Sequence, residues 1–439
     1  MTIRSPNFQG RDDQLDYRCC AALTVTAAAH GASPGADTSA SPEAVALRML
    51  HTADWHVGKT LRGRSRLDEH ERVLNEIVEI TRSEAIDVVA IAGDLFETSA
   101  PTTDAQQLVW RTLLALRDTG AEVVVVAGNH DSPHAFDAMR DVFNAARITM
   151  LGHPRSATNG GVITLTTASG DQVRVAMLPF VSQRFAVKAQ QLFELSGADA
   201  VKEYAADYRA LIHHLTSDAA PGCVNVLVAH CTIANSLFGG GERTAQSVFE
   251  YAVTGNVFPA DLHYVALGHL HRSQRIGAPC PAWYSGSPIQ VDFGETANTP
   301  KVLIVEAMAN TPARVTEHEL TTAARLQTVE GTVAELIARA PEFGTDWLRV
   351  RVLEPARAGL ADEIRAALPN AVDIHVVAAP TDEVAQPVGL PRSGRNATEL
   401  FSEYCASRNI NDPRINELFR ELLDVGTALS APATSQGDP

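Results

Sequence analysis

Residues 48–56 read RMLHTADWH, a short apolar segment followed by an aspartate and a histidine two positions apart. Similar segments occur at 86–94, IDVVAIAGD, and at 122–131, EVVVVAGNHD. Each apolar run has the length of a strand that is covered on both faces of a sheet. Between these runs, apolar residues recur at helical spacing over 67–83 and 102–118. This alternation of strand and helix predicts a layered α/β domain.

The same pattern continues toward the C-terminus. Residues 224–229 and 263–267 repeat the strand signature, and 162–167 with 173–178 predict a hairpin. From 326 to 377 the order strand, helix, strand, helix, strand predicts a second, smaller α/β module.

Polar side chains directly follow five of the predicted strands, those that end near residues 52, 92, 127, 229 and 267. In chain order these side chains are Asp54 and His56, then Asp94, then Asn129, His130 and Asp131, then His230, and finally His269 and His271. In open α/β sheets, ligands bind at the carboxyl ends of the strands. We therefore expect the five clusters to converge on one site.

The chemistry of these clusters points to metal ions. Carboxylates, one amide oxygen and several imidazoles form a mixed nitrogen and oxygen set, which suits divalent ions such as Mn²⁺, Fe²⁺ or Zn²⁺. Two such ions roughly 4 Å apart can bind a phosphodiester, generate a hydroxide and stabilise the developing charge. The glycines before Asp94, Asn129 and His269 permit tight turns and close backbone approach.

Each cluster taken alone has a simpler interpretation. His230 could be a hydrogen-bonded histidine of the core, Asp94 could belong to a plain turn, and Asn129 with His130 could precede a helix. The joint pattern, in this order and at these strand ends, favours the metal site.

The motifs resemble those of the calcineurin-like metallophosphoesterases. The longer strings HTADWHVGKTL at 51–61, AGDLF at 92–96 and AGNHDS at 127–132 are similar to the SbcD-type exonuclease subunits. The resemblance covers about residues 49–425. It implies an α/β metallophosphoesterase sandwich with a smaller α/β capping domain and C-terminal helices.

The resemblance also implies a role for each site residue. The first metal would be held by Asp54, His56, Asp94 and His271, and the second by Asp94, Asn129, His230 and His269, so that Asp94 bridges the two. His130 would contact the scissile phosphate without binding metal. Asp131 would orient His130, or would instead cap the helix that begins before Pro133. Glu97 stands near a position where archaeal and eukaryotic relatives often have a histidine, so the polarity of cleavage stays open.

The family further implies partners and a domain order. SbcD-type chains form homodimers within a heterotetramer with the SbcC ATPase, and they act on DNA. The corresponding segments are a disordered N-terminal extension at 1–48, a nuclease domain at 49–318, a capping domain at 319–385, a linker at 386–398, partner-binding helices at 399–425 and a disordered tail at 426–439. The helices at 399–425 could equally pack on their own domain.

The composition narrows the class of protein. The 439 residues carry a net charge of −16, which argues against a free-standing nucleic-acid binder but not against a nuclease whose metals or partner supply positive charge. No apolar run approaches the roughly 20 residues that span a bilayer, so we expect no membrane contact. Six scattered cysteines without a CxxC pair fit a reducing cytoplasm. For an SbcD-type protein we expect a cytoplasmic, nucleoid-associated location.

The resemblance implies a Mn²⁺-dependent double-strand exonuclease and single-strand endonuclease for DNA ends and hairpins in repair and recombination. The alternative is a metal-dependent phosphatase or phosphodiesterase for small nucleotides or phosphoproteins. Arg62, Arg64 and Arg66 follow the first metal motif, and we expect them to approach DNA phosphates rather than form a solvated loop.

Overall fold

The computed structural model describes residues 47–181, 197–218, 222–242 and 252–377, with isolated positions between 401 and 419. The predicted N-terminal extension (but for its last two residues), the linker, most of the partner-binding helices and the C-terminal tail lie outside the described residues. The proposed domain boundaries therefore stay predictions.

Two six-stranded sheets form the centre of the larger domain. The first has the order β14-β13-β1-β4-β5-β6 and the second β11-β12-β10-β9-β8-β7. The strands of the first sheet are β1 (Leu47–Thr52), β4 (Val88–Ile91), β5 (Glu122–Val126), β6 (Ile148–Leu151), β13 (Lys301–Met308) and β14 (Thr311–Glu319). Those of the second are β7 (Val162–Thr166), β8 (Gln172–Leu178), β9 (Val224–His230), β10 (Tyr264–Gly268), β11 (Gln274–Ile276) and β12 (Ala282–Tyr284).

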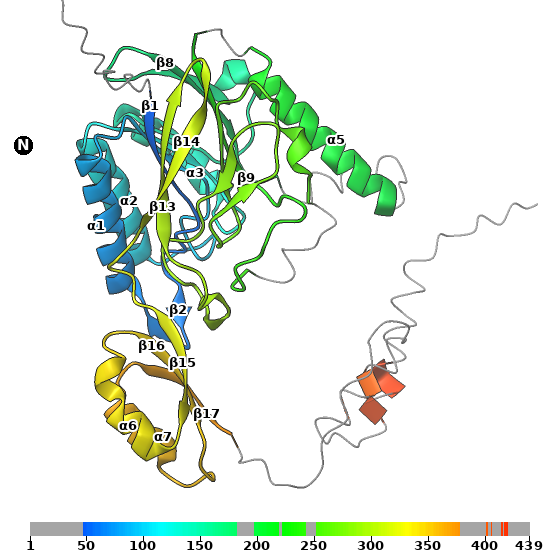
Figure 1. Cartoon of the computed structure of the whole chain (residues 1–439). Coiled ribbons are helices and arrows are strands. Elements are labelled where there is room, and N and C mark those ends of the chain that lie inside the picture. The colour runs from blue at the N-terminus through cyan, green and yellow to red at the C-terminus, as the bar shows by residue number, and fades with distance from the viewer. Residues whose placement is uncertain are drawn as a thin grey trace, which may run out of the picture.

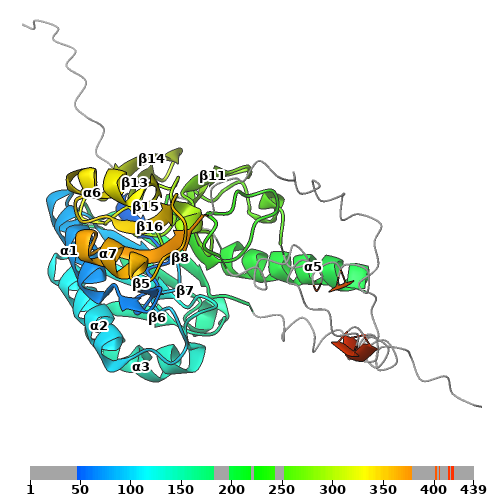
Figure 2. The same cartoon turned by 90° about the horizontal axis from the view of Figure 1, so that it is seen from below.

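The two sheets pack face to face, and helices cover their outer faces (Figure 1). Valines and methionines of both sheets, such as Met49, Val124 and Met177, form the layer between them. Helices α1 (Leu67–Ser83), α2 (Thr103–Asp118) and α3 (Pro133–Ala145) cover the first sheet, and α5 (Gly197–Thr216) covers the second. Figure 2 shows these two helical layers on opposite sides of the domain. The predicted α/β sandwich is confirmed.

Strand direction brings the polar clusters to one edge. In the first sheet β1, β4 and β5 run parallel, and in the second β8, β9 and β10 run parallel. The loops that follow β1, β4, β5, β9 and β10 therefore start at the carboxyl ends of parallel strands, and these ends lie at one edge of the two sheets.

None of the helices that the structure describes is long and apolar enough to cross a bilayer.

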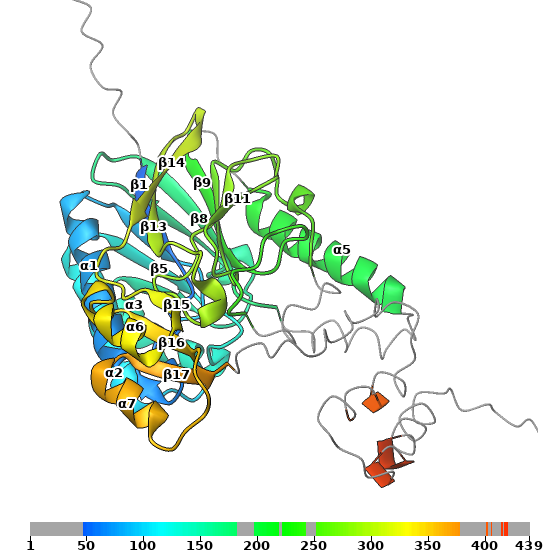
Figure 3. The ribbon, with the colours of Figure 1, turned by 60° about the horizontal axis from the view of Figure 1, so that its bottom comes forward.

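The smaller module has the predicted order of elements. Its sheet β15-β16-β17 is parallel, with α6 and α7 on one side (Figure 3). The elements are β15 (Leu326–Gly331), α6 (Val333–Ala338), β16 (Trp347–Val352), α7 (Leu360–Ala367) and β17 (Ala371–Val376). Leu336, Val350 and Ile364 lie at the centre of its own apolar core.

A short hairpin, β2 (Thr60–Leu61) with β3 (Arg64–Ser65), extends from the larger domain and contacts the smaller module. The hairpin and the residue after it carry the arginines that the sequence predicted to approach DNA. Arg66 is buried in an ion pair with Glu69, so the prediction that it approaches DNA is wrong. Arg62 pairs with Asp373 of β17, and Arg64 donates to the carbonyl of Pro369. These arginines hold the smaller module because the hairpin projects toward it rather than into the predicted site.

Candidate metal centre

Four of the predicted ligands sit on an unusual backbone. Asp54, His56 and Asp94 have φ angles of 53°, 47° and 53°, and His269 has a φ of 108°. Non-glycine residues rarely adopt positive φ, and such conformations cluster at functional sites. Hydrogen bonds hold two of these residues, because Asp54 N donates to Gly93 O and His56 N to Asp94 O, both at 3.0 Å.

The glycines of the motifs permit the close approach that the sequence predicts. A Cβ added to Gly128 would lie 2.1 Å from Asp94 Oδ1, and one added to Gly268 would lie 1.9 Å from Ala92 O. The second contact joins the end of β10 to the end of β4, so Gly268 lets the two sheets meet at the site.

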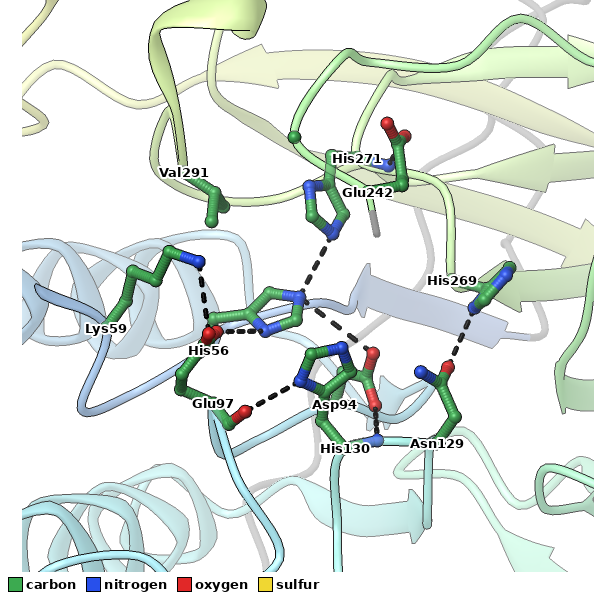
Figure 4. A pocket seen from close by; sticks show the side chains of 11 residues that line it. His56, Lys59, Asp94, Glu97, Asn129, His130, Glu242, His269, His271 and Val291 are labelled. Carbon is green, nitrogen blue, oxygen red and sulfur yellow. Dashed lines mark hydrogen bonds and ion pairs between the residues drawn. The ribbon is translucent and has the colours of Figure 1, made fainter. Parts of the chain in front are cut away.

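The first group of ligands comprises Asp54, His56 and His271, whose ligand atoms all lie within 4.8 Å of one another. His56 Nε2 lies 3.0 Å from His271 Nε2 and 3.9 Å from Asp94 Oδ2 (Figure 4). The other nitrogen of each ring faces a carboxylate: His56 Nδ1 lies 3.2 Å from Glu97 Oε2, and His271 Nδ1 lies 2.5 Å from Glu295 Oε1.

The second group comprises Asp94, His230 and His269, again within 4.8 Å, with Asn129 among them. Asn129 Oδ1 lies 2.9 Å from His230 Nε2 and 2.8 Å from His269 Nδ1. His230 Nδ1 donates to the carbonyl of Ala92 at 2.7 Å, which leaves a lone pair on Nε2. That nitrogen also lies 3.5 Å from Asp94 Oδ2.

This geometry fits metal ions. An imidazole whose Nδ1–H donates to a carboxylate or carbonyl presents a lone pair at Nε2, which is the usual arrangement of metal-bound histidines. His230 and His271 do so, and His56 Nδ1 lies 3.2 Å from Glu97 Oε2. A cation between such atoms replaces their mutual repulsion with coordination. Asp94 lies beside both groups, where the bridging role was predicted.

Burial sets the charge state of the histidines. It lowers the pKa of His56 to about 4 and those of His230 and His269 to about 3, which favours the neutral form that binds metal. Burial also acts to lower the pKa of His271, but Glu295, Asp54 and Glu242 outweigh it and raise that pKa to about 9. A divalent ion bound there would take the place of the proton.

His130 lies beside the first group, and its backbone is fixed to the second. Its ring makes an edge contact with His56, with centroids 4.8 Å apart, and its Nδ1 donates to the carbonyl of Glu97 at 2.7 Å. Its backbone N–H donates to Asp94 Oδ1 at 2.8 Å. The ring lies in the pocket outside the two groups described above, although His56, Glu97 and His130 also have ligand atoms within 4.8 Å of one another.

Asp131 has neither of the contacts that the sequence suggested. Its carboxylate accepts hydrogen bonds from the backbone N–H groups of Gly128, Leu95 and Phe96. The cap of α3 is Ser132, and the ring of His130 is held by Glu97 O instead. The expectation that Asp131 orients His130 directly or caps the helix is therefore wrong; Asp131 ties the loop after β5 to the loop after β4.

Sequence reasoning missed three charged residues of the pocket or its wall. Lys59 and Glu242 line the pocket with the predicted residues, and Glu295 lies behind His271. Glu242 accepts hydrogen bonds from the backbone of Gly239, Gly240 and His271. Glu242 and Glu295 belong to none of the motifs quoted from the sequence, whereas Lys59 lies within the string HTADWHVGKTL, three residues after His56.

Comparison with known proteins identifies the family. The model of the calcineurin-like phosphoesterase family matches residues 47–273, just over half of the chain. The D subunit of the SbcCD nuclease from Bacillus subtilis (strain 168) is 37% identical over 264 residues, 60% of this chain and 66% of that protein. The proteins of the same name from Rhodobacter capsulatus and Escherichia coli (strain K12) are 34% and 28% identical, over 57% and 59% of this chain and 65% and 64% of theirs.

The chain thus matches slightly under two thirds of the length of these relatives. Two solved structures, TT1561 of Thermus thermophilus and a dimetal phosphatase from Danio rerio, match 63% of this chain and all of theirs at 10% and 11% identity. Their TM-scores are 0.35 and 0.36. The family match rests on the segment that holds all seven predicted ligands, and on that basis the chain belongs to the calcineurin-like phosphoesterase family.

Proposed function

We propose that the chain is the nuclease subunit of an SbcCD-like complex, a Mn²⁺-dependent double-strand exonuclease and single-strand endonuclease for DNA ends and hairpins. The observation that carries the proposal is the pair of ligand groups that meet at Asp94, with His130 beside them. The relatives named above are nuclease subunits, and this supports DNA as the substrate.

The site residues have distinct roles in this proposal. Asp54, His56, Asp94 and His271 hold one ion, and Asp94, Asn129, His230 and His269 hold the other. Two bound divalent ions supply Lewis acidity and a hydroxide for attack on a phosphodiester. The mixed donor set suits Mn²⁺.

His130 acts on the substrate. Because its Nδ1 donates to Glu97 O, its Nε2 is the nitrogen that can face a phosphate. A protonated ring there stabilises negative charge and can deliver a proton to the leaving oxygen. Asp131 supports this arrangement through the loop backbone rather than through the ring.

The proposal includes partners and a compartment. An SbcC-type ATPase subunit would supply the grip on DNA that a chain with a net charge of −16 lacks. The nuclease chain would form a homodimer within a heterotetramer in the cytoplasm, associated with the nucleoid. The smaller module would serve as the capping domain.

The test is cleavage of end-labelled duplex DNA and a hairpin with Mn²⁺, with and without the ATPase partner. Asp94→Asn is the inactive control, and bis(p-nitrophenyl) phosphate reports the metal chemistry alone. DNA cleavage that is lost in Asp94→Asn would support the nuclease. Hydrolysis of the small diester without any DNA cleavage, even with the partner, would move the function to the alternative class of phosphatases and phosphodiesterases.

A further inference from the structure

The pocket over the metal groups is strongly acidic. Asp94, Glu97 and Glu242 line it, and Lys59 is the one lysine or arginine among the described residues of its lining. Two bound ions would compensate the charge of one phosphodiester, but a DNA strand brings further phosphates on each side. Those phosphates would meet carboxylates unless a cation stands among them.

Lys59 is fixed at a defined distance from the metal ligands. Its backbone N–H donates to His56 O at 2.9 Å, across a tight turn in which Gly58 has a φ of 98°. The turn ends where β2 begins, so Lys59 lies between a predicted ligand and the hairpin that holds the smaller module. Its position therefore depends on the same backbone that orients His56.

Glu97 holds the side chain of Lys59 over the pocket (Figure 4). Lys59 Nζ lies 3.0 Å from Glu97 Oε1, while the other oxygen of Glu97 lies 3.2 Å from His56 Nδ1. The lysine side chain is 22% exposed, so its ammonium group is within reach of solvent and of a ligand. An ammonium has three N–H donors, and the bond to Glu97 uses one of them.

We propose that Lys59 binds a backbone phosphate next to the scissile phosphodiester, and that Glu97 positions the ammonium group for it. This inference rests on the proposed nuclease function. Lys59 then selects nucleic-acid strands over small phosphodiesters, because only a strand presents a second phosphate beside the one at the metals. A purely structural Lys59 would instead orient Glu97 and, through it, His56.

The first measurement compares two substrates for the full chain and its Lys59→Met and Lys59→Arg variants. We expect Lys59→Met to raise KM for an oligonucleotide roughly tenfold, the size of one charge-assisted hydrogen bond. The loss in kcat/KM on DNA should exceed the loss on bis(p-nitrophenyl) phosphate by the same factor. Lys59→Arg keeps the charge and should restore most of the affinity.

The second measurement is binding rather than turnover. A single strand with phosphorothioate linkages, which slow hydrolysis, is titrated by fluorescence anisotropy at several salt concentrations in Mn²⁺. One lost phosphate contact makes the slope of log K against log salt shallower by about 0.7. Arg82→Met is the matched control, because Arg82 is an exposed cation at the far end of α1 that pairs only with Glu79 among the described residues.

The outcomes separate the two proposals. If the wild-type chain cleaves DNA and Lys59→Met keeps its KM and its salt slope, the inference is wrong and the nuclease stands. Equal losses on DNA and on the small diester, with weaker metal binding, would assign Lys59 to the structural role and also overturn the inference. If the wild-type chain hydrolyses only the small diester, the nuclease proposal fails, and the inference with it.

Discussion

Nε2 of His56 and Nε2 of His271 face each other at 3.0 Å. The Nδ1 atom of each ring is turned to a carboxylate, Glu97 for His56 and Glu295 for His271, so both Nε2 atoms present lone pairs when the rings are neutral. Two lone pairs at this distance repel each other unless a proton or a metal ion lies between them. The raised pKa of His271, about 9, places a proton between them at neutral pH, and a bound metal ion would take the place of that proton.

Removal of metal should destabilise the chain, and His271→Gln should weaken the first site. An ion that binds only the folded state at 100 times its Kd stabilises that state by about 2.7 kcal/mol. We expect chelation to lower Tm, Mn²⁺ to restore it, and His271→Gln to bind fewer ions by elemental analysis. His213→Gln, an exposed histidine of α5, is the control. Wild-type ion content in His271→Gln would contradict the assignment.

Glu295 should set the affinity of the first site without binding the ion. It is 1% exposed, its Oε1 holds His271 Nδ1 at 2.5 Å, and its Oε2 accepts from Val291 N at 2.7 Å. Loss of such a partner weakens metal binding about 10- to 100-fold. We expect this loss in Glu295→Gln, measured by competition with a chelating dye. Glu317→Gln, on the exposed edge strand β14, should bind metal as the wild type does.

The sequence predicted the parts of the site that lie directly after strands. The period of apolar residues located α1 and α2 to within one residue, and it predicted the order of elements in the smaller module. The close backbone approach at the motif glycines, and the meeting of the polar clusters at one site, were predicted from the positions of these residues at strand ends. Short motifs and strand ends are local features, and a single sequence carries them.

Long-range contacts could not be predicted in this way. The alternation suggested one layered domain, but β13 and β14 join the first sheet from beyond residue 300, and β7 to β12 build a second sheet. Glu295 reaches His271 from a turn 24 residues away, and no motif announces it. We predicted that Arg66 contacts DNA because it follows a metal motif, but it lies buried in an ion pair with Glu69.

His130→Asn should separate metal binding from turnover. The ring of His130 contacts His56 and donates to Glu97 O but is not part of the predicted ligand set. General acid catalysis by a positioned histidine typically contributes about 10²- to 10⁴-fold. We expect turnover to decrease by a factor in this range, while elemental analysis still finds two ions bound to the chain. Full activity in His130→Asn would exclude a catalytic role, and loss of metal would make His130 a ligand.

Arg66 and Glu69 form a buried polar junction between the larger domain and the smaller module. Arg66 donates to both oxygens of Glu69 and to the carbonyl of Gln290, and Trp347 Nε1 of the smaller module donates to Glu69 Oε2 at 2.9 Å. Burial acts to raise the pKa of Glu69, but Arg66 and Trp347 outweigh it and hold that pKa below its usual value. The carboxylate is therefore ionised in the folded chain at neutral pH.

Arg66→Met should lower the free energy of unfolding by about 3 kcal/mol at pH 7, because it leaves a buried carboxylate without its cation. A lowered carboxyl pKa stabilises the fold above the unfolded-state value of 4.5, and this contribution is lost as the pH falls through the folded value. The wild type should therefore lose stability below pH 4.5, and the gap to Arg66→Met should narrow there.

Urea unfolding in chelator at pH 7 and pH 4 measures both effects, with chelator present so that metal binding does not contribute. The double variant Arg66→Met with Glu69→Gln removes the unpaired charge and should recover part of the loss, because the remaining cost is that of packing and hydrogen bonds. A single-variant loss below about 1 kcal/mol at pH 7, or no recovery in the double variant, would show that the ion pair does not hold the junction.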